Sequence, residues 1–203
     1  GYIESSRATD FSLSVDSAVA AVREHQPDVV FLCSPNNPTG TALHPEVVAA
    51  VHDVASGVVV VDEAYGEFSR RDSAATLLRT HPRLIVVRTM SKAFALAGAR
   101  IGYAVASPAV VDALQLVRLP YHLSAVSQAV ALAALEHTTE LLGWVDELKR
   151  QRDRICEALQ DMGYDVVGSD ANFGFFGGVA DQSLVWRQLL ESSVLIRDGG
   201  IPA

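Results

Sequence analysis

The first half of the chain alternates between short apolar runs and segments with helical periodicity. Continuous apolar runs rich in valine predict strands buried on both faces at 28–33, 57–62 and 83–89. Apolar residues spaced three and four positions apart predict amphipathic helices over 14–25 and 44–55. Because strands and helices alternate along the chain, the pattern predicts a mostly parallel sheet with helices on its faces and right-handed crossovers.

Beyond this region the pattern becomes mainly helical. A strand is expected over 100–107, and a helix starts at Pro108 and stops before Pro120. Helical periodicity continues over 123–162, first in an alanine-rich stretch and then in a highly charged one. A long helix that changes character in this way often connects two domains.

After Gly163 the pattern changes to short elements of both kinds. It predicts a helix at 181–193 and strands within 164–169, 171–178 and 194–198. We therefore expect a domain boundary near residue 140. A larger α/β domain would cover 1–139, and a smaller α+β domain would cover 140–203.

Composition excludes several classes of protein. Hydrophobic residues make up 49% of the chain and charged residues 20%, as in ordinary globular proteins. The net charge of −8 argues against nucleic-acid binding, and no apolar run is long enough to cross a membrane. Cys33 and Cys156 form no C-x-x-C motif, and the histidines show no metal-ligand spacing, so we expect no disulfide framework and no metal site. A reducing cytoplasm is the expected location.

The acidic pair Asp62 and Glu63 follows the most hydrophobic strand, at the strand end where open α/β sheets bind ligands. One interpretation is a Mg²⁺-nucleotide site, because such a pair resembles the Walker B segment of ATPases. That site also needs a glycine-rich loop ending in Gly-Lys, and the chain has no Gly-Lys dipeptide. The other interpretation is an organic cation.

Two further strand ends carry candidate ligand-binding groups. Lys92 follows the strand at 83–89 among small and apolar residues, surroundings that favour the neutral, nucleophilic amine. The strand at 28–33 is followed by SPNNPTG (34–40), in which asparagine amides stand between prolines. Together with Asp62, these groups predict one ligand site at the carboxyl edge of the sheet.

Three motifs in this order resemble the fold-type I pyridoxal-phosphate (PLP) enzymes, and among them the class I and II aminotransferases: NNPTG (36–40), DEAY (62–65) and SKAFALAGARIG (91–102). The longer matches VDEAYGEF, RLPYHLSAVSQA and IRDGGIP resemble histidinol-phosphate aminotransferases of actinobacterial type. The resemblance implies an incomplete three-layer α/β/α large domain followed by part of a small domain.

The resemblance assigns a role in cofactor binding or catalysis to eight residues of this chain. Lys92 would hold PLP covalently and move a proton at the substrate, while Asp62 would pair with the pyridine nitrogen. Asn37 and Tyr65 would contact the phenolic oxygen, and Ala64 would lie against the ring. The phosphate would bind Arg100, Ser91 and Thr89.

Other residues near these motifs receive weaker assignments. Glu63 points to the other side of its strand from Asp62, so we expect a structural role. Tyr121 and His122 lie in a segment similar to the family's substrate side, and Asn172 lies in a family-like SDANF.

The resemblance implies a cytoplasmic homodimer that transfers the amino group of histidinol phosphate to 2-oxoglutarate, giving glutamate, in histidine biosynthesis. One alternative is a PLP lyase similar to threonine-phosphate decarboxylase. Another is a catalytically incomplete fragment, because the family's N-terminal phosphate-binding segment and C-terminal substrate arginine have no counterpart in these 203 residues. In that case we expect low stability and weak or no turnover.

Overall fold

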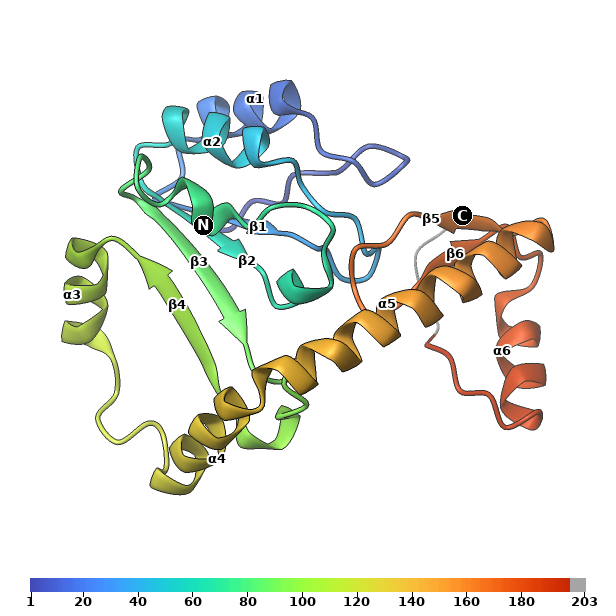
Figure 1. Ribbon diagram of the computed structural model, residues 1–203. Coiled ribbons are helices and arrows are strands. Elements are labelled where there is room, and N and C mark those ends of the chain that lie inside the picture. The colour runs from blue at the N-terminus through green and yellow to red at the C-terminus, as the bar shows by residue number, and fades with distance from the viewer. Residues whose placement is uncertain (198–203) are drawn as a thin grey trace.

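The computed structural model describes residues 1–197, and in this part of the chain a four-stranded sheet forms the centre of the molecule (Figure 1). The strands are β1 (Val29–Cys33), β2 (Val58–Asp62), β3 (Leu84–Thr89) and β4 (Gly102–Ala106), in the order β1-β2-β3-β4. The first three are parallel, and β4 runs antiparallel to β3. The predicted α/β class with a mostly parallel sheet is confirmed.

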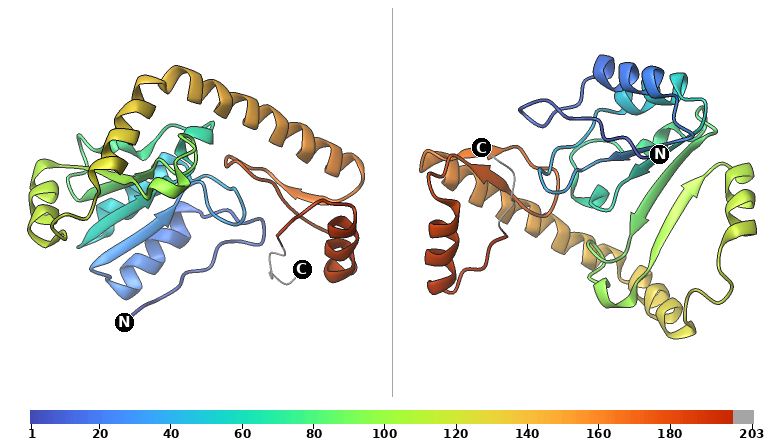
Figure 2. Two further views of the ribbon diagram at one scale, coloured as in Figure 1. Left: turned by 90° about the horizontal axis from the view of Figure 1, so that it is seen from below. Right: turned by 180° about the vertical axis from the view of Figure 1, so that it is seen from behind.

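Helices α1 (Val15–His25) and α2 (Pro45–Val54) lie side by side on one face of the sheet (Figures 1 and 2). Ser14 caps α1 by accepting a hydrogen bond from the Ser17 amide, and Pro45 suits the first turn of α2, where an N–H has no helical partner. Their apolar faces and the inward side chains of the strands form one core, which includes Val22, Val48, Val51, Val59, Val61, Leu84 and Val86.

A second core lies at the carboxyl ends of the strands. It is built from the short 3₁₀ turn η1 (Gly66–Phe68), the segment after β3 and the long helix α5 (Thr138–Asp161). Phe68 is fully buried and Val145 of α5 nearly so. This core holds the predicted site segments together; its buried members are Tyr65, Phe68, Met90, Ala93, Phe94, Ile101, Val145 and Ala171.

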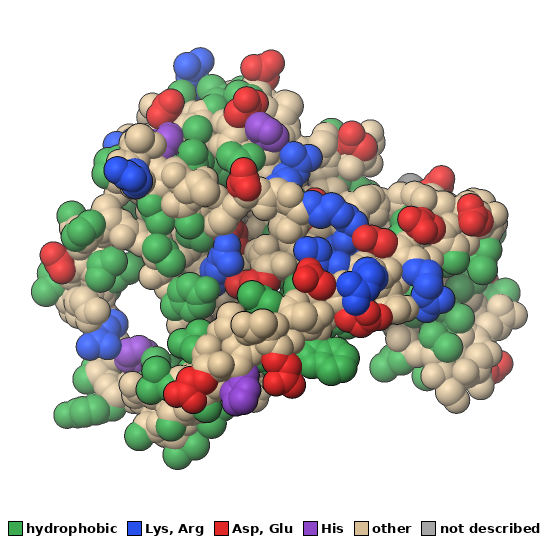
Figure 3. Space-filling view, viewed as in Figure 1, with side chains coloured by type: hydrophobic (Ala, Val, Ile, Leu, Met, Phe, Trp, Pro, Cys, Tyr) green, Lys and Arg blue, Asp and Glu red, His purple; other side chains and the backbone are tan. Residues whose placement is uncertain are grey.

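Helices α3 (Pro108–Val117) and α4 (Ala125–Glu136) follow β4 and contain no buried residue. Figure 3 shows apolar side chains gathered over this part of the molecule, whereas charges of both signs cover α5. Leu116 and Leu119 are 87% and 74% exposed. An apolar surface of this extent is typical of an interface with another polypeptide. No helix in the described part of the chain has both the length and the hydropathy for crossing a membrane.

The C-terminal part contains the antiparallel pair β5 (Asp165–Val167) and β6 (Phe175–Gly177), followed by α6 (Gln182–Glu191). The strand predicted at 194–198 is wrong for residues 194–197, which are irregular, and Asp198 lies outside the described residues. The apolar run has no neighbouring strand with which to pair, because the described C-terminal sheet consists of β5 and β6 alone. α5 passes through residue 140 without a break.

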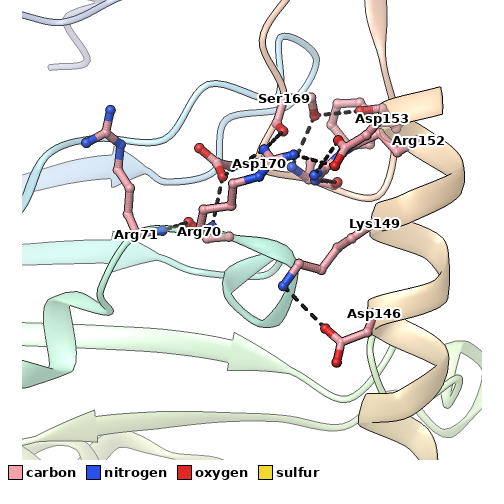
Figure 4. Close-up of polar contacts among 11 residues, drawn as sticks. Arg70, Arg71, Asp146, Lys149, Arg152, Asp153, Ser169 and Asp170 are labelled. Atoms are coloured by element: carbon pink, nitrogen blue, oxygen red, sulfur yellow. Dashed lines mark hydrogen bonds and ion pairs between the residues drawn. The ribbon is translucent and has the colours of Figure 1, made fainter. Parts of the chain in front are cut away.

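Polar contacts attach the C-terminal part to the sheet domain (Figure 4). Arg70 follows η1, and its guanidinium pairs with Asp153 of α5 at 2.6 Å and donates to the Ser169 carbonyl at 3.0 Å. The Arg70 amide also donates to Asp170 at 2.8 Å. The buried Arg152 donates to the Ala171 carbonyl at 2.7 Å. One arginine from each part therefore fixes the segment at 169–171.

A close backbone contact adds to this attachment. The amide of Asp170 donates to the carbonyl of Gly40 at 2.8 Å, which joins the NNPTG loop to the segment before β6. Gly40 has a φ of +78°, and a Cβ at this position would lie 2.3 Å from Ser169 Oγ. Only glycine can adopt this left-handed φ and also leave room for Ser169 without displacing the neighbouring chain.

Other small elements complete the chain. The 3₁₀ turn η2 (Ala74–Leu77) lies between β2 and β3, and η3 (Ala97–Ala99) lies between β3 and β4. Lys149 forms an ion pair with Asp146 on α5 at 3.4 Å (Figure 4). Its side chain is 26% exposed.

Candidate functional site

The predicted site segments meet at the carboxyl edge of the parallel sheet. β1 and β2 are in register with Cys33 opposite Asp62, and β2 and β3 with Asp62 opposite Val87. The NNPTG loop leaves β1 and the lysine segment leaves β3, on either side of the Asp62 strand. Parallel pairing thus places all three motifs at one edge, as the sequence predicted.

Tyr65 connects the three motifs. It is 8% exposed, and its hydroxyl accepts a hydrogen bond of 3.1 Å from the side-chain amide of Asn37. The Nζ of Lys92 lies 5.3 Å from the centre of the Tyr65 ring, a favourable cation–π distance. Phe173 contacts the ring edge to face at 5.2 Å between centroids. The tyrosine is therefore fixed between the asparagine amide and the lysine.

The two acidic residues of DEAY have different surroundings. Asp62 is half-buried, and its Oδ1 accepts a hydrogen bond of 2.9 Å from the Ala64 amide. Glu63 is buried on the other side and accepts hydrogen bonds from Arg88 at 2.7 Å and from the Ser73 hydroxyl at 2.7 Å. The second carboxylate oxygen of Asp62 therefore has no described hydrogen bond, whereas both oxygens of Glu63 accept hydrogen bonds from neighbouring residues.

Thr89 and Ser91 lie together. The Thr89 hydroxyl donates to Ser91 Oγ at 2.9 Å, and the Ser91 amide donates to Thr89 Oγ1 at 3.1 Å. The amide of Met90 donates to the Ile101 carbonyl at 3.0 Å, so the chain just after Arg100 returns to this pair. Arg100 is exposed, has a left-handed φ of 55°, and donates to the Ala97 carbonyl at 3.2 Å. The hydroxyls of Thr89 and Ser91 and the guanidinium of Arg100 thus come from chain segments that lie next to each other.

Some expectations about single side chains are corrected. Lys92 is exposed rather than enclosed by apolar residues, because Ala93 and Phe94 turn into the second core while the lysine points outward. Tyr121 is fully exposed, and the His122 imidazole contacts only the backbone, at the Leu119 carbonyl 2.9 Å away. Asn172 is also exposed and has no described side-chain contact with the site residues.

Two neighbours of the site were not predicted from the sequence. Arg7 donates to the Cys33 carbonyl at 3.0 Å and to the Phe11 carbonyl at 3.2 Å, which anchors the N-terminal segment beside β1. Partial desolvation and the Asp62 carboxylate raise the pKa of the Cys33 thiol, while the Arg7 charge lowers it. No local motif marks Arg7, and only the β1–β2 register reveals that Cys33 lies beside Asp62.

A cavity of about 830 Å³ opens next to Asn37. Most of its wall comes from the C-terminal part and includes four aromatic side chains and an arginine: Phe173, Phe175, Phe176, Trp186 and Arg197. The cavity therefore lies between the NNPTG loop and the elements after α5, where a ligand of moderate size could contact both parts of the chain.

Comparison with known proteins agrees with this geometry. The family model "Aminotransferase class I and II" matches residues 2–203. A histidinol-phosphate aminotransferase of Streptomyces avermitilis is 57% identical over 99% of this chain and 56% of its own length. This chain thus spans about half the length of the curated relatives that it matches.

Solved structures have the same fold. Histidinol-phosphate aminotransferase from Sinorhizobium meliloti, in complex with pyridoxal-5'-phosphate, superposes with a TM-score of 0.84 at 30% identity, over 96% of this chain and 55% of that one. A decarboxylase from Sulfurospirillum multivorans superposes with a TM-score of 0.81 at 25% identity, over 97% and 59%. On the strength of the family match, the three motifs and their convergence at one sheet edge, this chain belongs to the class I and II aminotransferase family.

Proposed function

We propose that this chain is the central part of a PLP-dependent histidinol-phosphate aminotransferase. The observation that carries the proposal is the convergence of Lys92, Asp62 and the hydrogen-bonded pair Asn37–Tyr65 at one edge of the sheet. The name of the Streptomyces avermitilis relative, which is 57% identical to this chain, supports the same substrate class. Transfer of the amino group to 2-oxoglutarate would make glutamate and would belong to histidine biosynthesis.

The donor groups match the chemistry of the proposed cofactor. The free Asp62 oxygen can accept a hydrogen bond from a protonated ring nitrogen, and the pair Asn37–Tyr65 can donate to a phenolic oxygen. Ala64, bonded through its amide to Asp62, offers a small side chain toward a ring. The phosphate would bind three donors after β3: Thr89, Ser91 and Arg100.

The roles of the protein residues follow from their positions. When bound, PLP supplies an electron sink for the carbon that loses its proton. The Lys92 amine would hold the cofactor covalently, and once released from it would carry a proton to and from the substrate. Tyr65 limits the positions of that amine, because its ring lies 5.3 Å from Nζ and is itself fixed by Asn37. The Asp62 carboxylate would pair with the ring nitrogen and so favour its protonated form.

Cofactor binding is tested by absorption spectroscopy after adding PLP, followed by borohydride reduction and peptide mapping. We expect a reduced adduct at Lys92 and its loss in Lys92→Ala. The matched control is Lys149→Ala, since the chain has no other lysine and this one pairs with Asp146 on α5. An adduct at another position, or no adduct, would contradict the cofactor assignment.

A PLP lyase is the second candidate, favoured by the likeness to the decarboxylase from Sulfurospirillum multivorans. Adding histidinol phosphate to the PLP-loaded protein separates the two. An aminotransferase converts the cofactor to its amine form without releasing carbon dioxide, and 2-oxoglutarate reverses the change. Carbon dioxide release from an amino-acid phosphate, independent of any keto acid, would favour the lyase.

We further propose a cytoplasmic homodimer. The exposed apolar side chains of the α3–α4 region, among them Leu116 and Val126, support burial against a second copy. Cys33 and Cys156 are both free thiols, which is compatible with a reducing compartment. Sedimentation of the protein with Leu116→Glu should show monomers where the parent chain shows dimers.

A further inference from the structure

Two histidines and an aspartate converge at the edge of the sheet opposite the candidate PLP site. His52 and Asp53 lie at the end of α2, and His81 precedes β3, so both segments lead into the amino ends of strands. His52 Nδ1 lies 3.6 Å from Asp53 Oδ1, and His81 Nε2 lies 4.0 Å from the same oxygen. These three atoms all lie within 4.8 Å of one another.

His52 is buried without a polar partner. It is 5% exposed, and within the described part of the chain neither of its ring nitrogens has a hydrogen bond. Native proteins rarely leave such atoms unsatisfied, so the unpartnered Nδ1, which lies beside Asp53, points to a missing ligand.

His81 is oriented by its own contacts. Its Nδ1 lies 3.0 Å from the Leu77 carbonyl and 2.8 Å from Thr80 Oγ1. We assign the proton to Nδ1, since a carbonyl oxygen only accepts hydrogen bonds. The lone pair of Nε2 then faces Asp53. A backbone carbonyl behind one ring nitrogen is the usual support of a histidine that binds metal through the other.

We propose that His52 Nδ1, Asp53 Oδ1 and His81 Nε2 form a binding site for a divalent transition metal, with Zn²⁺ as the best match. Nitrogen and carboxylate ligands suit this class of ion better than Mg²⁺ or Ca²⁺. Tetrahedral Zn²⁺ with bonds of about 2.0–2.1 Å places its ligand atoms roughly 3.3 Å apart. The observed distances of 3.6 and 4.0 Å exceed this value, so the side chains would move closer together when the ion binds.

The surroundings allow an ion to enter. The Asp53 side chain is 72% exposed, which leaves a path from solvent and a fourth position for water. Arg83 is a nearby positive charge, but its guanidinium donates to the carbonyls of His52 and Ala55 at 3.0 and 2.8 Å. It is thereby held on the backbone rather than on the Asp53 carboxylate.

The position of the site indicates a structural role. The ion would join the end of α2 to the segment between η2 and β3, and so hold two chain segments that are distant in sequence. The PLP residues follow the opposite ends of the strands, so this site lies outside the proposed chemistry. No metal site was expected from the sequence, because His52 and His81 do not have metal-ligand spacing and only the fold brings them together.

The test is calorimetric titration of the PLP-free 203-residue chain with Zn²⁺ at neutral pH, with Cys33 and Cys156 alkylated. We expect one ion per chain and a melting temperature that rises with Zn²⁺ concentration. Asp53→Asn and His81→Gln should each weaken binding at least tenfold and remove the thermal shift. The matched control His44→Gln, at an exposed helix cap, should bind like the parent chain.

Both test positions can be changed without exchanging the buried His52, so the variants are expected to fold. Unchanged Zn²⁺ affinity in Asp53→Asn and His81→Gln, or no binding to the parent chain, would overturn the proposal. Because neither result depends on PLP, the metal site and the proposed function stand or fall separately.

Discussion

Glu63→Gln is expected to lower the stability of the fold while leaving the PLP-binding residues in place. The Glu63 side chain is 5% exposed and accepts four hydrogen bonds, two from Arg88 and one each from the Ser73 hydroxyl and the Ala74 amide. Burial alone would lower the pKa of Arg88, but the carboxylates of Glu63 and Glu67 raise it, so the arginine remains charged.

The magnitude follows from the charge that the substitution leaves behind. Removing one partner of a buried ion pair costs about 3–5 kcal/mol, because the other charge stays desolvated. Arg88 keeps Glu67 at 2.9 Å, so we expect the lower end, about 3 kcal/mol. Replacing all three charged residues together, as Glu63→Gln with Arg88→Met and Glu67→Gln, leaves no uncompensated charge and should recover part of that loss.

Urea unfolding followed by circular dichroism measures this cost. Asp62→Asn is the matched comparison, since Asp62 is half-buried and its side chain accepts a single described hydrogen bond, from the Ala64 amide. We expect that variant to lose only about 1 kcal/mol but to fail in the PLP absorption assay. A loss below about 1 kcal/mol for Glu63→Gln, or equal effects of both variants on PLP binding, would refute the division of roles within the acidic pair.

Three further predictions concern the surroundings of the site. Partial burial raises the pKa of Asp153, but hydrogen bonds from arginines lower it, and the net effect is a lowered pKa. The charged Asp153 therefore stabilises the fold above the ordinary aspartate pKa of about 3.9, and this stabilisation is lost as the pH falls through the lowered pKa of the folded chain. The stability gap between parent and Asp153→Asn in urea unfolding should therefore close below about pH 4, and a constant gap would exclude the ion pair as its cause. The Asp62 charge raises the Cys33 pKa, so Asp62→Asn should speed alkylation of Cys33 by iodoacetamide at pH 8, and an unchanged rate would argue against a charged Asp62 beside the thiol. Gly40→Ala should destabilise the chain by about 1–3 kcal/mol, because its left-handed backbone leaves no room for a Cβ beside Ser169, and a neutral result would mean that this contact is loose in solution.

Strands and helices of the sheet domain were predictable because their local patterns and their tertiary environment agree. The valine run at 57–62 suits a strand enclosed by neighbours, and β2 lies between β1 and β3. The run at 194–198 looks similar in sequence, yet residues 194–197 form no strand, because local propensity cannot supply a partner. Pairing depends on residues far away in the chain.

Part of the candidate site was also predictable from the sequence, because its residues directly follow the predicted strands. Parallel pairing places the carboxyl ends of β1, β2 and β3 at one edge of the sheet. Asn37, Asp62 and Lys92 could therefore be assigned to one site from the sequence. The exposure of Lys92 could not, since it depends on how Ala93 and Phe94 pack into the second core. The pairing of Arg70 with Asp153 and the convergence of His52 on His81 also join distant segments that carry no shared motif.

The unbroken helix α5 has a mechanical consequence. Its 24 residues span about 36 Å at 1.5 Å per residue, and it is packed against the sheet domain through Val145 and continues to the β5–β6 pair (Figure 2). About 24 Å of this helix lies beyond Val145, so a tilt of about 10° at Val145 moves the far end of the helix by roughly 4 Å. Small rotations at the second core would thus be enough to widen or narrow the aromatic wall facing Asn37.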